Sequence, residues 1–297
     1  NQTTANNFTG FSPNGKYFAY FKDSCWWVYD FKKELHLNLS KANVPECGHS
    51  ENGAASSYGI AGWGVGDSCL FLYDHHDLWR VAFDGSSPVR LTNGREKGIV
   101  YRTVALGKNL LSNSKGSIEI DTRGRILLSG KGKDATGYFY LEPNGTVKTI
   151  VYNDFLNNSI IKADDTGVYA FQSQRYDNPP ALHSYNTKKG AIRLAYQSNV
   201  QHWNYRWGRQ EQITYTNSSN KKLKGILYYP ADHDPSRKYP MVVSIYEELQ
   251  YMKPYYFNPT VYNPAGFNIP ALTSQGYFVL LPDIVYGKGN PGMDACV

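Results

Sequence analysis

The segment from Lys238 to Asp283 begins KYPMVVSIYEEL and closes with SQGYFVLLPD, and the interpretation of the whole chain depends on it. It holds two short apolar runs, Met241–Tyr246 and Tyr277–Leu281, which are rich in Val, Ile, Leu and aromatic residues and are bounded by Pro or Gly. Continuous apolar runs of this length are typical of strands covered on both faces, as in a parallel sheet flanked by helices. We therefore expect the two runs to be neighbouring parallel strands of a buried sheet.

Four similar units occur before residue 204. Residues that mark one turn of each unit, Asp30, Asp84, Asn144 and Asn186, are spaced 54, 60 and 42 residues apart. A period of about 40–60 residues with several short strands per unit is typical of β-propeller blades. A β-sandwich would also contain short strands and Gly-rich turns, but the recurrence of one turn and strand order favours the propeller. We expect residues 1–203 to form about four blades of an incomplete propeller.

The chain changes character near residue 205. Glu211–Thr216 and Leu223–Tyr229 alternate around a polar turn, which predicts an antiparallel hairpin. The first buried strand follows, then a long Pro- and Tyr-rich connection, a short helix at Ile269–Gln275 that ends at Gly276, and the second buried strand. Because an α/β domain with an antiparallel edge begins in this order, we expect residues 204–297 to be the start of such a domain.

The composition favours a strand-rich protein of about two domains. The 297 residues include 25 Tyr, 13 Phe and 6 Trp, which suit half-buried pleated surfaces. The formal charge is +6, but Lys and Arg are scattered, so a nucleic-acid partner is not expected. No run of 18 apolar residues occurs, so no membrane-spanning segment is expected.

Three segments together resemble the prolyl oligopeptidase family of serine peptidases, which includes the dipeptidyl peptidases and the acylaminoacyl peptidases. They are HDLWRVAFDGSSPVRLTNG (76–94), QITYTNSSNKKLKGILYYPADHDPSRKYPMVVSIYEE (212–248) and SQGYFVLLPDIVYGKGNPGMDA (274–295). The resemblance implies an α/β-hydrolase domain with a Ser, Asp and His triad, covered by a propeller that admits small peptides. It also implies acyl-enzyme chemistry without a metal or an organic cofactor.

The catalytic triad is not expected within this chain. A nucleophilic serine of this fold lies in a G-x-S-x-G turn, with its acid and base later in the chain, and no serine here has Gly two residues before and two after it. The family pattern places this turn shortly after residue 297, so we expect a hydrolase domain truncated before the nucleophile elbow. The fragment alone should be inactive and should need the rest of the same polypeptide.

Tyr246 is the one catalytic candidate that the resemblance supplies. In the family, a Tyr after the first buried strand donates its hydroxyl to the tetrahedral oxyanion, and Tyr246 occupies that position. A phenol donor at the carboxyl end of a strand suits the place where open α/β sheets bind ligands. The alternative is a Tyr that merely packs at a strand end with its hydroxyl in water.

Other candidates have simpler explanations. Glu247 and Glu248 could form an acidic pair but more often are solvated neighbours that point apart. Asp74, His75, His76 and Asp77 could suggest a metal site, but turn chemistry between two strands is favoured.

The remaining polar candidates are also weighed against structural roles. Arg175 and Tyr176 could contact substrate or form an interface salt bridge. His202 and His233 precede the nucleophile region, whereas the family's base comes last in the chain. Asp283 is expected to anchor the loop that follows it.

The cysteines and the glycosylation sequons give information about the cellular compartment of the protein. One disulfide among Cys25, Cys47 and Cys69 is about as well supported as free thiols, and Cys296 is remote from them in sequence. Six N-x-S/T sequons begin at Asn1, Asn7, Asn38, Asn144, Asn157 and Asn217. Together with the resemblance, the sequons favour an extracytoplasmic location, periplasmic or secreted.

Two alternatives to a peptidase stay open from the sequence. One is a propeller used as a protein-binding scaffold, with a hydrolase domain that is not catalytic. The other is an α/β-hydrolase esterase. Homo-oligomerisation, the scissile-bond preference and the total number of blades also stay open.

Overall fold

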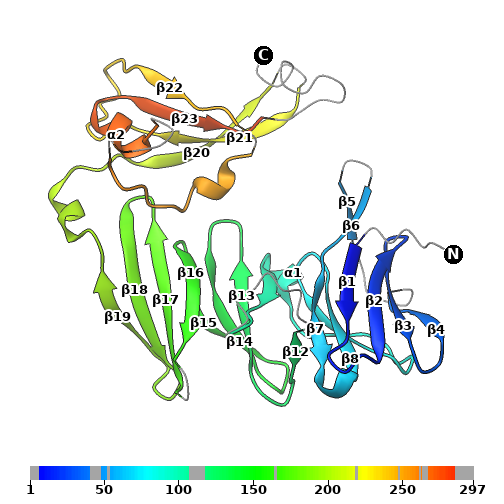
Figure 1. Cartoon of the computed structure of the whole chain (residues 1–297). Helices are drawn as coiled ribbons and strands as arrows, with labels where there is room; N and C mark the ends of the chain where they lie inside the picture. The colour runs from blue at the N-terminus through cyan, green and yellow to red at the C-terminus, as the bar shows by residue number, and fades with distance from the viewer. Residues whose placement is uncertain are drawn as a thin grey trace. The chain divides into compact units, whose positions relative to one another are not determined.

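The computed structural model describes residues 7–40, 48–51, 54–106, 118–163, 166–217, 220–246, 248–260, 262 and 267–284. β-Strands are the main secondary structure of these residues (Figure 1). The chain forms two compact units, Asn1–Asn153 and Asp154–Val297, and each is built around its own sheets.

Three larger sheets and a two-stranded hairpin make up the first unit. Sheet A is the antiparallel series β1 (Asn7–Phe11), β2 (Tyr17–Lys22), β3 (Cys25–Asp30) and β4 (Leu35–Asn38). Sheet B contains β7 (Ile60–Gly64), β8 (Cys69–Tyr73), β9 (Leu78–Ala82) and β10 (Val89–Arg90), with β12 (Glu119–Ile120) parallel to β7. Sheet C contains β11 (Val100–Thr103), β13 (Ile126–Lys131), β14 (Thr136–Leu141) and β15 (Val147–Asn153). The smaller elements are the hairpin β5 (Gly48–Glu51) and β6 (Ala54–Ser57), the 3-10 turn η1 (Val65–Asp67) and the helix α1 (Gly94–Lys97).

Sheet D and a mixed sheet make up the second unit. Sheet D is the antiparallel series β16 (Leu156–Lys162), β17 (Val168–Arg175), β18 (Asn178–Asn186) and β19 (Ala191–Gln197). The mixed sheet has the order β20 (Gln210–Thr216), β21 (Lys222–Tyr228), β23 (Phe278–Pro282) and β22 (Met241–Val243). The 3-10 turns η3 (Val200–Asn204) and η4 (Gln250–Met252) and the helix α2 (Ile269–Ser274) connect or flank these sheets.

The four marker residues of the repeat occupy one equivalent turn. Each lies where the third strand of its sheet turns into the fourth: Asp30 and Asn186 end β3 and β18, and Asp84 and Asn144 follow β9 and β14. In every case the side-chain oxygen accepts a hydrogen bond from the backbone N–H two residues later, at 2.9 or 3.0 Å. Asp and Asn favour such turns because their side chains replace a backbone acceptor. The periodicity in the sequence is therefore a structural repeat.

Alternating strand side chains join the sheets of the first unit face to face. In β8, Leu70 and Leu72 enter a core shared with Trp26 of sheet A, whereas Phe71 enters a second core shared with Tyr101 of sheet C. Successive side chains of a strand point to opposite faces, so a central strand with both faces covered is buried throughout. Burying each large apolar side chain contributes about 1.5–3 kcal/mol.

A single core joins sheet D to the mixed sheet within the second unit. Tyr176, which follows β17, packs with Ile226 and Tyr228 of β21 and with Val279 and Leu281 of β23. All five side chains are at most 1% exposed.

The predicted parallel pair of the mixed sheet is confirmed. β22 pairs with β23 in parallel register, with Met241 opposite Phe278 and Val243 opposite Leu280. The hairpin of β20 and β21 is antiparallel, as expected, and β21 also pairs antiparallel with β23 (Figure 1).

The prediction that Met241–Tyr246 is covered on both faces is wrong. The strand ends at Val243, and Met241 and Val243 are each 48% exposed. β22 lies at the edge of the mixed sheet as described, so it has a strand neighbour on one side only. β23, an inner strand, also alternates: Val279 and Leu281 are buried, whereas Phe278, Leu280 and Pro282 are half-buried.

The short helix before β23 is confirmed, with both caps in place. The Asn268 Oδ1 atom accepts a hydrogen bond from the Ala271 N–H at 2.9 Å, which satisfies one of the free donors at the start of α2. Gly276 adopts a left-handed φ of +87°, which ends the helix where a side chain would be strained.

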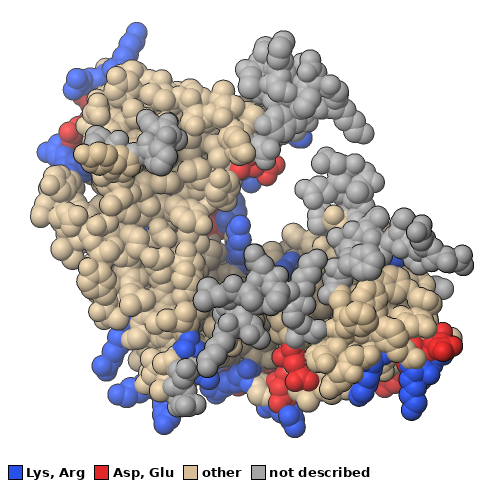
Figure 2. All heavy atoms as spheres, viewed as in Figure 1, with Lys and Arg blue, Asp and Glu red and all other residues tan. Residues whose placement is uncertain are grey.

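Charged side chains on the face drawn in Figure 2 form several separate groups of both signs, and no single basic patch dominates that face. Among the described residues, no helix combines the length and the apolar character needed to cross a membrane.

Candidate functional site

Tyr246 lies just beyond the carboxyl end of the parallel pair. The Ser244 N–H donates to the Leu280 carbonyl at 3.0 Å, so pairing with β23 continues one residue past β22. Two residues later, the Tyr246 side chain is 64% exposed. An exposed phenol at a parallel strand's carboxyl end can meet a ligand there, because this edge of an open α/β sheet is where ligands bind.

The segment after Tyr246 is fixed to the end of β23. The Leu249 N–H donates to the Asp283 Oδ1 atom at 2.8 Å, and Leu249 is itself buried in the core of the second unit. Downstream, the Gln210 side chain donates to the Lys253 carbonyl at 2.9 Å. The connection that carries Tyr246 is thus held at several points.

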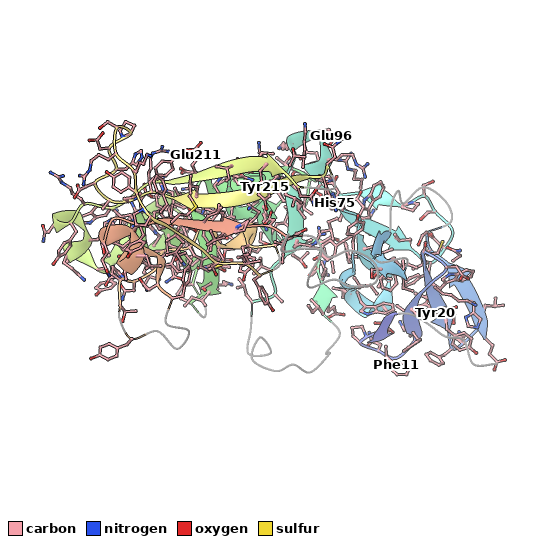
Figure 3. All side chains as sticks on the ribbon, turned by 90° about the horizontal axis from the view of Figure 1, so that it is seen from above. Phe11, Tyr20, His75, Glu96, Glu211 and Tyr215 are labelled. Atoms are coloured by element: carbon pink, nitrogen blue, oxygen red, sulfur yellow. The ribbon has the colours of Figure 1, made fainter. Side chains whose placement is uncertain are left out.

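The observed side-chain contact of Asp283 is with the loop that precedes it in the sequence, whereas the sequence predicted a contact with the loop that follows. Its own N–H donates to the Lys224 carbonyl at 2.8 Å, and its carbonyl accepts the hydroxyl of Tyr215, which is labelled on β20 in Figure 3. Residues 285–297 lie outside the described residues, so its expected contact with the following loop is untested. The signal available in the sequence was a Pro-Asp pair directly at the end of an apolar strand.

The two acidic candidates next to Tyr246 are only partly described. Glu248 is exposed, as a solvated carboxylate is expected to be. Glu247 lies outside the described residues.

The Asp74–Asp77 cluster is a turn in which both Asp residues are buried and His75 is exposed. The Asp74 Oδ1 atom accepts the N–H groups of His76 and Asp77, and Oδ2 accepts the Trp79 indole N–H at 3.0 Å. Asp77 accepts from the Thr92 hydroxyl at 2.6 Å and pairs with Arg90. Both carboxylates are fully buried, so hydrogen bonds within the protein replace their hydration. The turn interpretation is confirmed.

Glu96 of α1 extends this network at the surface. His75, from the turn, and Glu96, from α1, are labelled in Figure 3. Glu96 also pairs with Arg90, and this guanidinium lowers the pKa of Glu96 to about 2. Within the part of the chain that the structure describes, no three His, Cys, Asp or Glu side chains gather in a way that could hold a metal ion.

Arg175 and Tyr176 belong to the packing of the second unit. Arg175 pairs with Asp154 and, at 2.6 Å, with Asp177. Burial raises the pKa of Tyr176 to about 12, and the Trp207 indole N–H donates to the Tyr176 carbonyl at 3.0 Å. Arg175 thus forms salt bridges, but both partners flank strands of its own sheet D, so the expected interface salt bridge is not what the described contacts show.

The two histidines weighed from the sequence are enclosed by aromatic rings. His202 is 6% exposed and packs against Trp203 and Trp207, and burial lowers its pKa. His233 contacts Tyr229 and Phe278.

Cys25 and Cys69 are free thiols, so a disulfide between these two is excluded. Cys47 and Cys296 lie outside the described residues.

Sequence reasoning missed Asp67, which joins sheets A and B. Its carboxylate accepts the Ser12 hydroxyl at 2.6 Å and the Asn14 side-chain amide at 3.1 Å, as well as backbone N–H groups of Asn14 and Lys16. Burial opposes ionisation, but these hydrogen bonds outweigh it and hold the pKa of Asp67 below its ordinary value. A single Asp in a Gly-rich loop gave no signal of this role.

Comparison with known proteins identifies the fold through structure. No family model and no curated protein sequence matches the chain. The structure is similar to a protein assigned as dipeptidyl aminopeptidase IV from Bacteroides ovatus, with 14% identity and a TM-score of 0.59 over 97% of this chain. It is also similar to prolyl oligopeptidase B from Galerina marginata (11% identity, TM-score 0.53, 96% of this chain) and to the AtxE2 isopeptidase (13%, 0.50, 89%).

These structural neighbours include dipeptidyl peptidase IV and prolyl oligopeptidase family members, which confirms the resemblance at the level of the fold. The chain spans 43%, 37% and 37% of the three structures, respectively.

Proposed function

We propose that the chain is part of a serine-type peptidase that hydrolyses peptide bonds of small peptides through an acyl-enzyme. The observation that carries this proposal is the structural similarity to a dipeptidyl aminopeptidase IV over 97% of the chain. The similarity to prolyl oligopeptidase B over 96% of the chain supports the same peptidase class.

In this proposal, residues 1–203 are propeller blades and residues 204–297 open an α/β-hydrolase domain. The equivalent turns of sheets A to D support the first assignment, since blades are repeats of one four-stranded unit. The parallel pairing of β22 and β23 beside an antiparallel hairpin supports the second. The triad belongs to the rest of the polypeptide.

The chemistry assigned to Tyr246 is stabilisation of negative charge. The nucleophilic serine oxygen attacks the peptide carbonyl carbon while a histidine takes its proton, and the carbonyl oxygen becomes an oxyanion. The Tyr246 hydroxyl donates a hydrogen bond to this oxyanion. The C–N bond then breaks, the amine leaves with the proton from histidine, and water hydrolyses the acyl-enzyme. A donor placed for the oxyanion stabilises the transition state more than the substrate.

The test uses the full-length protein. A fluorophosphonate probe should label one serine covalently, and labelling should fall when a dipeptide or acyl-peptide substrate competes. Under the same conditions, the rate enhancement over the uncatalysed reaction should be larger for peptide amides than for simple esters. A full-length protein that takes no label and hydrolyses neither substrate would support the binding scaffold instead, and a labelled protein that cleaves esters alone would support the esterase.

A further inference from the structure

We propose that Asp283 is a positioning residue that holds Tyr246 in place for catalysis. This inference rests on the proposed function of Tyr246. Asp283 follows directly on β23 and is 7% exposed, and its carboxylate reaches back to the chain just beyond Tyr246.

The segment that carries Tyr246 is tied to β23 on both sides. Before it, the Ser244 N–H donates to the Leu280 carbonyl at 3.0 Å. After it, the Leu249 N–H donates to the Asp283 Oδ1 atom at 2.8 Å. Only residues 245–248 lie between these two attachment points. Such a short span limits how far the backbone of Tyr246 can move while both bonds are present.

Asp283 is well suited to be one of the two attachment points. Its N–H donates to the Lys224 carbonyl at 2.8 Å, and its carbonyl accepts the Tyr215 hydroxyl. The backbone of Asp283 is therefore fixed to β21 and β20. Its bond to the Leu249 N–H is charge-assisted when the carboxylate is ionised, and such bonds are stronger than neutral ones.

Loss of this carboxylate should affect the position of Tyr246 more than the fold. Leu249 is buried, so its N–H would lose its acceptor away from solvent, and the loop would gain by shifting to reach water. An oxyanion donor acts only within a narrow range of distance and direction, and a displacement of about 1 Å can cost about 100-fold in rate.

The experiment compares variants of the full-length protein by kcat, with active sites counted by fluorophosphonate labelling. Asp283→Ala should lower kcat per active site by about 10- to 100-fold with KM nearly unchanged. Asp283→Asn keeps an oxygen acceptor for the Leu249 N–H and should retain most of the activity. Asp234→Ala is the matched control, because Asp234 accepts the Ser236 N–H in an exposed turn of the same unit.

Double variants separate positioning from a structural role. In a Tyr246→Phe background, Asp283→Ala should cost little further kcat, because both changes remove the same interaction. Full additivity of the two losses would overturn the inference. So would an Asp283→Ala protein with wild-type kcat per active site and a lowered unfolding temperature, since that result describes stability alone.

Two further outcomes keep the test decisive. If the Asp283→Ala protein does not fold, Asp283→Glu is tested in its place. Glu keeps the negative charge but moves the acceptor oxygen by one methylene. An Asp283→Glu protein with the same kcat as Asp283→Asn would then overturn the inference. If Tyr246→Phe itself leaves kcat unchanged, the proposed role of Tyr246 fails first, and the inference fails with it.

Discussion

Asp77 and Asp283 are both buried next to strand ends, but they hold different kinds of structure. The Asp77 carboxylate accepts from Thr92, the Gly94 N–H and Arg90, so its partners all belong to one compact corner of the first unit. The Asp283 carboxylate reaches instead to Leu249, in a loop that also carries an exposed tyrosine.

The contrast gives a way to test whether a buried carboxylate only stabilises the fold or, as we propose for Asp283, positions another residue. Both are satisfied, so burial alone does not distinguish them. The two residues differ in the segment that their carboxylates bind. Asp77 binds a closed turn, whereas Asp283 binds the loop that exposes Tyr246 to solvent. Substitution of Asp77 should therefore lower the stability of the fold, and substitution of Asp283 should lower kcat.

The largest effect on stability is expected at Asp77. Asp77→Ala should lower the free energy of unfolding of the first unit by about 3–5 kcal/mol, because it leaves Arg90 and several N–H and O–H donors without their buried acceptor. Denaturant titration of the full-length protein would measure this loss. Asp84→Ala is the control, since Asp84 lies in an exposed turn, and it should change the transition little. Equal effects of the two substitutions would contradict the structural account of Asp77.

A smaller, pH-dependent effect is expected at Asp67. Since the folded state lowers the pKa of Asp67 below its ordinary value of about 3.9, its contribution to stability is complete above that pH and is lost as the pH falls through the folded pKa. Asp67→Asn should therefore lose less stability than the wild type on acidification below about pH 4. Unfolding temperatures measured from neutral pH down to about pH 2 test this. Parallel pH profiles for the two proteins would exclude the assigned linkage.

The smallest effects on stability are expected from two tyrosines of the mixed sheet. Burial raises the pKa of Tyr228, and its buried hydroxyl has no hydrogen-bond partner among the described residues, so Tyr228→Phe should be neutral or stabilising by up to about 1 kcal/mol. Tyr215→Phe removes the bond to the Asp283 carbonyl and should cost about 1 kcal/mol. Both values come from denaturant midpoints. A loss at Tyr228 as large as that at Tyr215 would show that the Tyr228 hydroxyl is satisfied in solution.

Much of the fold could be predicted because local chemistry specified it. The sequence predicts strands at the apolar runs Trp26–Tyr29, Cys69–Tyr73, Tyr138–Leu141 and Val168–Ser173, and these runs lie within the observed β3, β8, β14 and β17. The parallel pairing of β22 with β23 also followed from composition.

Other features depend on tertiary contacts that no local pattern shows. β12 is two residues long and pairs in parallel with β7, so its sequence gives no periodicity to detect. The exposure of Met241 and Val243 depends on which other segments cover β22. The sequence of an apolar run does not show whether another segment covers it. The predicted domain boundary between residues 203 and 204 remains a prediction.

The candidate site was predicted only in part, for the same reason. Tyr246 was a candidate because the family resemblance places such a Tyr after the first buried strand, and Asp283 was noted for its place at a strand end; the role of Tyr246 stays a prediction. The bond between Asp283 and Leu249 spans 34 residues, and no spacing rule in the sequence indicates it.

The central claim is that Tyr246 supplies an oxyanion donor in a serine peptidase. The most direct test is kcat of Tyr246→Phe in the full-length protein, measured per labelled active site, beside Tyr251→Phe, whose side chain is 60% exposed in the next turn of the same connection. The account predicts that Tyr246→Phe lowers kcat by about 10- to 1,000-fold while Tyr251→Phe does not. An unchanged kcat for Tyr246→Phe would contradict it.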